Sequence, residues 1–68
     1  MSDVTVRFGR RLRAVRTEKG ISQEELAQRS GLHRTYVSSV ERGERNISLI
    51  NIAKLANALG VKPSELMP

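Results

Sequence analysis

Apolar side chains recur along this chain at helical spacing rather than at strand spacing. Phe8, Leu12 and Val15 fall at i, i+4 and i+7, which places them on one face of a helix. Gly20 is the signal for the end of that helix. The β-branched run of residues 4–6 leaves open where the helix begins, since such side chains are poor helix formers.

A second helix is expected directly after this one. Ser22 followed three residues later by Glu25 is the pattern of a capping box, which opens a helix. Leu26 and Ala27 then lie on its inner face. The helix stops before Gly31, because a sharp turn requires a positive φ, which glycine adopts without steric cost.

A third helix follows almost at once, over about residues 34–42. Val37 and Val40 are three residues apart, so they share a face and pin this helix inward. The remaining positions are then expected to face outward: Arg34, Thr35, Ser38 and Ser39. Gly43 is expected as its C-cap. Two short helices joined by a tight turn form a helix-turn-helix over residues 22–42, a device that places its second helix in the major groove of DNA.

Two further helices are predicted in the rest of the chain. Ser48 is a typical N-cap, and Gly60 terminates the helix that it opens. Pro63 suits the first position of a short fifth helix. The alternative, a strand over residues 48–52, leaves that strand without a partner. One face of the fourth helix carries Leu49, Ile52, Ala53, Ala56 and Leu59.

The pattern predicts an all-α fold of five helices in a single domain, residues 1–68. Helices this short are not stable alone, so they must share one core. With one Phe and one Tyr in the chain, that core is aliphatic. Its expected members are Phe8, Leu12, Val15, Leu26, Ala27, Leu32, Val37, Val40, Ile52, Leu55 and Leu59.

Composition narrows the range of functions. The chain has no cysteine and one histidine, which argues against a disulfide, a metal site, a cofactor and an enzyme. No apolar run reaches the ~20 residues that span a membrane, and residues 1–11 resemble no signal peptide. We expect a soluble, intracellular protein.

Positive charge is concentrated at one end of the chain. The net charge is +5, and nine of the twelve cations are arginines, which suit two-pronged contact with phosphate or guanine. Residues 1–20 carry six cations and two acids, whereas residues 21–46 carry four of each. The first helix, rather than the helix-turn-helix, is therefore expected to supply the electrostatic attraction.

The chain resembles the Cro and lambda-repressor-like family, whose members are called Xre-type regulators. The family pattern stands here as RAVRTEKGISQEELAQRSGLHRTYVSSVERG followed by SLINIAKLANALGV, and the resemblance covers roughly residues 8–67. The stretch HRTYVSSVERGERN is most similar to the controller proteins of restriction–modification systems. The resemblance implies a five-helix lambda-repressor-like DNA-binding domain. It also implies a place in the bacterial or phage cytoplasm, in association with the nucleoid.

This resemblance implies a role for each position of the motif. The positions that match base readers are Arg34, Thr35, Ser38 and Ser39, and an arginine suits the O6 and N7 atoms of guanine. Those expected at the phosphates are Gln23, His33, Tyr36, Arg42, Arg45 and Asn46. For several of these the alternative is an ordinary solvated side chain, and His33 can also serve as a weak helix cap.

The resemblance also implies two structural features. Arg16 and Glu41 match an internal ion pair that joins the first helix to the third. The C-terminal end matches a two-fold dimer interface, although its side chains can instead close the core of the single chain. The candidate interface residues are Leu59, Val61, Pro63, Leu66 and Met67.

The resulting hypothesis is a transcriptional regulator that binds a pseudo-palindromic operator in double-stranded DNA as a homodimer. It would repress by blocking RNA polymerase or activate by touching it. One alternative is the DNA-binding antitoxin of a toxin–antitoxin pair, which a neighbouring toxin-sized reading frame would favour. Another is a protein-interaction domain that has lost DNA binding, which would need neither Arg34 nor the basic first helix.

Overall fold

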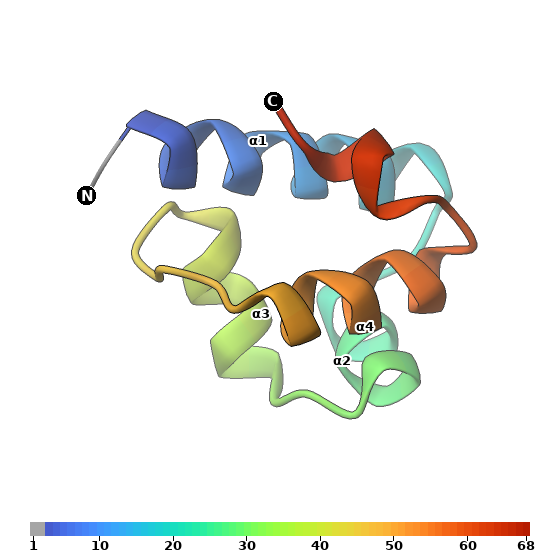
Figure 1. Cartoon of the computed structure of the whole chain (residues 1–68). Helices are drawn as coiled ribbons and strands as arrows, with labels where there is room; N and C mark the ends of the chain where they lie inside the picture. The colour runs from blue at the N-terminus through green and yellow to red at the C-terminus, as the bar shows by residue number, and fades with distance from the viewer. Residues whose placement is uncertain (1–2) are drawn as a thin grey trace.

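The computed structural model describes residues 3–68, and every regular element in that range is a helix (Figure 1). The all-α prediction is confirmed. The count of five α-helices is wrong, because the last element is a four-residue 3-10 helix, too short for a full α-helical turn between Pro63 and the extended Met67. In chain order the elements are α1 (Asp3–Glu18), α2 (Gln23–Ser30), α3 (Arg34–Glu41), α4 (Leu49–Leu59) and η1 (Pro63–Leu66).

Tertiary packing overrides the weak helix propensity at the start of the chain. α1 begins at Asp3, so the β-branched residues 4–6 lie inside it. Residues 49–52 belong to α4 rather than to a strand, and Ser48 is the N-cap of that helix. The Ser48 hydroxyl caps this helix by accepting a hydrogen bond from the backbone N–H of Asn51 at 3.1 Å.

Helix α2 begins at the predicted N-cap and ends at the predicted turn. The Ser22 hydroxyl accepts a hydrogen bond from the backbone N–H of Glu25 at 3.0 Å. The Glu25 carboxylate instead pairs with Arg29 one turn later. Gly31 has a φ of 74°, in the left-handed region that lets the chain reverse without strain.

The third helix ends one residue earlier than expected. Arg42 is its C-cap, and Gly43 follows with a positive φ. This glycine also lies against α1, since an added Cβ would stand 2.9 Å from Cα of Val6. The loop after α3 is thereby held against the start of α1.

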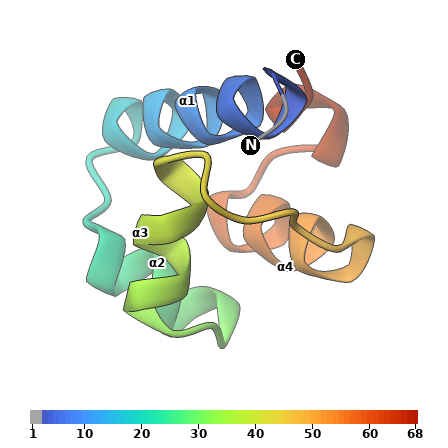
Figure 2. The ribbon, with the colours of Figure 1, turned by 90° about the vertical axis from the view of Figure 1, so that its left-hand side faces the viewer.

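The helices enclose a single aliphatic core between α1 and the remaining elements (Figures 1 and 2). Ten of the eleven expected core residues are buried; Leu32 is only half-buried, because it lies in the turn before α3. Among the described residues, three further buried apolar side chains were not in the expected core: Ile21, Ala56 and Leu66.

Gly9, which lies inside α1 rather than in a turn, sets the distance between α1 and α3. An added Cβ on Gly9 would lie 2.3 Å from the carbonyl oxygen of Val40 and 2.7 Å from that of Glu41. No real Cβ approaches an oxygen so closely, so the two backbones can meet here only at a glycine. This contact brings the basic helix α1 onto the C-terminal end of α3.

Candidate nucleic-acid interface

A buried ion pair fixes the C-terminal end of α3. The Arg16 guanidinium donates from Nε to Oε2 of Glu41 at 2.6 Å and from Nη2 to Oε1 at 3.0 Å. Its Nη1 donates to the carbonyl oxygen of Ile21 at 2.8 Å. The hydrogen bond to Glu41 raises the pKa of Arg16, against the opposing effect of burial. The pair therefore joins α1, the α1–α2 turn and α3 at one point.

Gln23 extends this network to α2. Its side-chain amide donates a hydrogen bond to Oε1 of Glu41 at 3.0 Å. An amide NH₂ has two hydrogens, so one N–H remains available. Gln23 was predicted to bind a phosphate, and only this second N–H is free to do so. The hydrogen bond to Glu41 orients α2 against α3.

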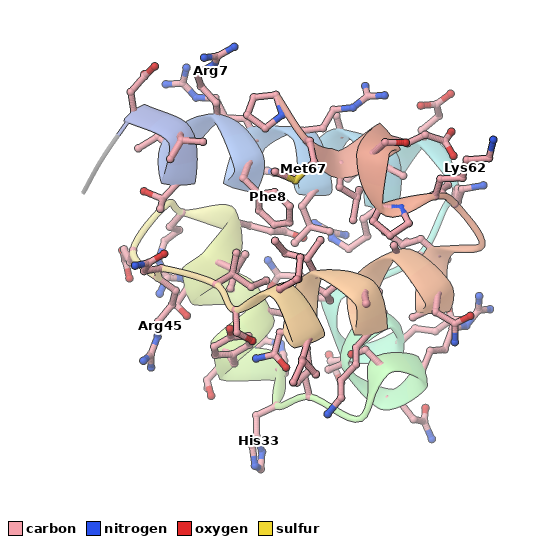
Figure 3. The ribbon with its side chains drawn as sticks, in the orientation of Figure 1. Arg7, Phe8, His33, Arg45, Lys62 and Met67 are labelled. Atoms are coloured by element: carbon pink, nitrogen blue, oxygen red, sulfur yellow. The ribbon has the colours of Figure 1, made fainter. Side chains whose placement is uncertain are left out.

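The first turn of α3 projects away from the core. His33, Arg34 and Thr35 are all exposed, and Figure 3 shows His33 pointing outward at the end of the molecule opposite α1. His33 occupies the N-cap position and forms no side-chain cap there. This turn therefore presents a guanidinium, an imidazole and a hydroxyl to the outside.

Tyr36 is held in place from two sides. Asn51, at the start of α4, donates a side-chain hydrogen bond to the Tyr36 hydroxyl at 3.0 Å. The Arg45 guanidinium carbon stands 5.6 Å from the centre of the Tyr36 ring, a cation–π distance. The phenol accepts from Asn51, so its own hydrogen is free to donate to another group. The loop after α3 and the start of α4 thus hold one tyrosine beside the exposed turn.

The two serines of α3 differ from their prediction as outward-facing base readers. Ser39 is buried, and its hydroxyl donates to the carbonyl oxygen of Tyr36 at 2.8 Å. It also accepts from Nε of Arg45 at 3.2 Å. Ser38 is half-buried and accepts from Arg42. The outward orientation predicted for Ser39 is wrong, because the loop after α3 folds back over it.

An exposed acid holds Arg42. The Arg42 guanidinium donates to both carboxylate oxygens of Glu44, at 2.9 and 3.1 Å. The resulting hydrogen bonds raise the pKa of Arg42 and lower that of Glu44. Arg42 was predicted at a phosphate, and to reach one it must exchange the Glu44 carboxylate for it. Asn46, two residues after Glu44, is exposed in the same loop.

The predicted dimer residues fall into two groups. Leu59 and Leu66 are 4% and 0% exposed, so they close the core of the single chain and are not available to a partner. Val61 is half-buried, whereas Pro63 and Met67 are exposed. Met67 and Phe8 both line a pocket of about 160 Å³, and Figure 3 shows these two side chains near one another.

Two polar residues of this surface were missed from the sequence. Asn51 orients Tyr36 from a different helix, and Glu44 pairs with a cation two residues away, a spacing that no helical rule detects.

Within residues 3–68 no three metal-ligating side chains gather, and no helix in that range is long and apolar enough to cross a membrane.

The geometry defines a helix-turn-helix whose second helix exposes its first turn, the class of protein that reads duplex DNA. Residues 12–66 match the Helix-turn-helix family, and the chain belongs to its Xre-type branch. It is therefore a DNA-binding transcriptional regulator and not an enzyme.

Relatives and solved structures agree with this assignment. The chain is 48% identical to control protein C.BamHI of Bacillus amyloliquefaciens over 97% of its length and 83% of that protein. It is also 48% identical to control protein C.MunI of Mycoplasma sp, covering 97% of this chain and 90% of the relative. It superimposes on the restriction-modification controller protein C.AhdI from Aeromonas hydrophila with a TM-score of 0.91 at 62% identity, covering 93% and 96% of the two chains.

Proposed function

We propose that this chain is a controller-type regulator that binds a pseudo-palindromic operator as a homodimer, with one copy of α3 in each of two successive major grooves. The observation that carries the proposal is the exposed first turn of α3, where Arg34 and Thr35 project beyond the core. The identity of 48% to two control proteins supports the regulatory role. Residues 1–68 act as a single DNA-binding domain.

Base reading is assigned to Arg34 and Thr35. An arginine donates two hydrogen bonds to guanine, and a threonine reaches either a base edge or a thymine methyl group. Ser38 accepts a hydrogen bond from Arg42 and keeps its own hydroxyl hydrogen, which can donate to a base edge. Ser39 acts indirectly, by holding Arg45 beside Tyr36.

Phosphate binding is assigned to the side chains around this turn. The Tyr36 hydroxyl and the Gln23 amide each keep one hydrogen that can donate to a phosphate. His33 is exposed and points away from the molecule (Figure 3). Arg45, Asn46 and, after release from Glu44, Arg42 hold the neighbouring phosphate backbone. Contacts of this kind set affinity and register, whereas the base contacts set specificity.

Selection from random duplex DNA tests the proposal. The expected product is an inverted repeat with half-site centres about 34–36 Å apart. Enrichment of an asymmetric site without a second half, or no enrichment, overturns the homodimeric reading. A dimer on such an operator excludes RNA polymerase from an overlapping promoter or contacts it from an adjacent one.

A further inference from the structure

Helix α1 carries a cluster of exposed arginines. Arg7, Arg10 and Arg11 lie at i, i+3 and i+4, so their side chains are neighbours on the surface of the helix. All three are exposed, and we call them the α1 patch. Like charges at these spacings repel one another, so the patch favours the approach of a polyanion.

The contacts of the α1 patch leave its positive charge available. Arg7 approaches Asp3 at 3.7 Å, and the two side chains are 57% and 83% exposed; a pair of this kind is weak. Arg11 donates from Nε to the carbonyl oxygen of Glu65 at 2.7 Å, which anchors the guanidinium and leaves its other N–H groups. Within residues 3–68 the Arg10 guanidinium has neither an ion pair nor a hydrogen bond.

The α1 patch and the first turn of α3 lie on opposite sides of the domain. In both views of the ribbon α1 runs along one side, and the turn between α2 and α3 lies at the other (Figures 1 and 2). Figure 3 shows Arg7 pointing out from the first side and His33 from the second.

This separation limits what the α1 patch contributes at α3. The Cα trace measures 27 × 23 × 21 Å, so its shortest extent is more than twice the Debye length of about 8 Å at physiological ionic strength. The field of the patch is therefore largely screened at a duplex bound by α3. The attraction expected of the first helix acts mainly on a polyanion that approaches from the other side.

We propose that the α1 patch is a second binding site for duplex DNA, independent of base sequence. A chain bound to its operator through α3 can then hold another DNA segment on α1. The inference rests on the proposed function in assigning the operator to α3. In a dimer with both copies of α3 on one side of a duplex, two patches lie on the far side.

Arginine chemistry and charge density favour duplex DNA at this site. A guanidinium donates two parallel hydrogen bonds to a phosphate. From Arg7 to Arg11 the helix rises about 6 Å, and duplex DNA carries one negative charge per roughly 1.7 Å of its axis. A duplex alongside the patch therefore offers at least as many charges as the patch has arginines.

The composition of this side argues against a protein partner. Among the exposed residues between positions 7 and 17, Ala14 is the only apolar one. Protein interfaces have an apolar, well-packed centre, which this side of α1 lacks. Contacts with phosphates need no such centre, because their affinity comes from the release of counterions.

A capture assay tests the second site. The protein is loaded on an immobilised operator duplex, unbound protein is washed away, and a fluorescent duplex of random sequence is added. Wild type should capture it, with a log–log salt slope of about −2.7 per copy if three phosphates are bound. Arg7→Gln combined with Arg10→Gln should reduce capture roughly tenfold or more and the slope by about 1.8. Operator affinity should change by less than about threefold.

Lys19→Gln combined with Lys62→Gln is the matched control. It removes the same charge from two exposed residues outside the α1 patch, and it should capture the random duplex as wild type does. Glutamine is a good helix former, so circular dichroism should find both double variants folded.

Competition identifies what the patch binds. Unlabelled duplex should displace the captured duplex, whereas polyglutamate at equal charge should not; displacement by both overturns the assignment to DNA. Equal capture by wild type and the arginine variant, or no capture by wild type, overturns the α1 patch while the proposed function stands. A chain that does not remain on the operator contradicts the proposed function and, with it, a second site.

Discussion

Arg16 and Glu41, in α1 and α3, meet in a two-pronged ion pair although 25 positions separate them in the chain. Their side chains are 10% and 3% exposed, and Gln23 donates a third hydrogen bond to the same carboxylate. Three elements of the domain are therefore oriented by one acidic side chain. The pair sets how α3 is presented rather than what it reads.

Removal of one member of this pair should destabilise the domain strongly. Glu41→Ala leaves the Arg16 guanidinium buried without a counter-charge, which is expected to cost about 3–5 kcal/mol. Urea unfolding followed by circular dichroism measures it. The control is Arg29→Ala, which breaks the half-exposed pair with Glu25 and should cost less than about 1 kcal/mol. Equal losses for the two variants would contradict the account.

The contact at Gly9 allows a second test of packing. Gly9→Ala places a methyl group against the backbone oxygens of Val40 and Glu41, where nothing flexible can yield. α1 must then separate from α3, and we expect a loss of several kcal/mol, in the range of severe overpacking. Gly20→Ala is the control: it has a positive φ but open space around it, so it should cost only about 1 kcal/mol. A Gly9→Ala variant that melts like wild type would disprove this packing.

Sequence and structure agree best where the determinants are local. The caps at Ser22 and Ser48 and the turn at Gly31 follow from residue chemistry within one helical turn, and all three are found. The need for glycine at position 9 was not predicted. It arises from the close approach of the α3 backbone, and nothing near Gly9 in the sequence indicates that contact.

The interface residues show the same division. The exposure of Arg34 and Thr35 follows from helical periodicity and is found. Ser39 was assigned to the outside by the same periodicity, but the irregular loop carrying Arg45 covers it. Leu66 was assigned to a partner, yet in a small domain every large apolar side chain near the core is needed to complete it.

Arg34→Ala should weaken operator binding by about 1–3 kcal/mol and relax the preference at one base position of each half-site. The reason is the loss of two hydrogen bonds to a guanine. Binding-site selection with wild type and variant measures both effects. Arg13→Ala, an exposed cation on α1, is the control and should weaken all sequences alike. An unchanged base preference for Arg34→Ala would remove its reading role.

Tyr36→Phe should weaken binding of all sequences by a similar factor. The variant keeps the ring beneath Arg45 and loses only the hydroxyl, which the account assigns to a phosphate. A hydrogen bond to a charged group contributes about 1.5–3 kcal/mol. Fluorescence anisotropy on specific and random duplexes measures the loss. A change of base preference instead would place the hydroxyl at a base edge.

Glu44→Gln should strengthen DNA binding by freeing Arg42. The hydrogen bond from Arg42 lowers the pKa of Glu44. The Arg42–Glu44 ion pair is therefore fully formed above the ordinary glutamate pKa and is lost only as the pH falls through the lowered value. At neutral pH the carboxylate therefore competes with phosphate. If Arg42 then gains one phosphate, the log–log salt dependence should steepen by about 0.9 per copy. Weaker binding of Glu44→Gln would show that the pair with Glu44 positions Arg42 for DNA rather than competing with phosphate.

The central claim is that two copies of α3 are held at one separation on the same side of the duplex. The most direct measurement is the affinity for the selected operator before and after insertion of five base pairs between its half-sites, which is about half a helical turn. The account predicts that the insertion reduces affinity to that of a single half-site. Full affinity for the lengthened operator would contradict it.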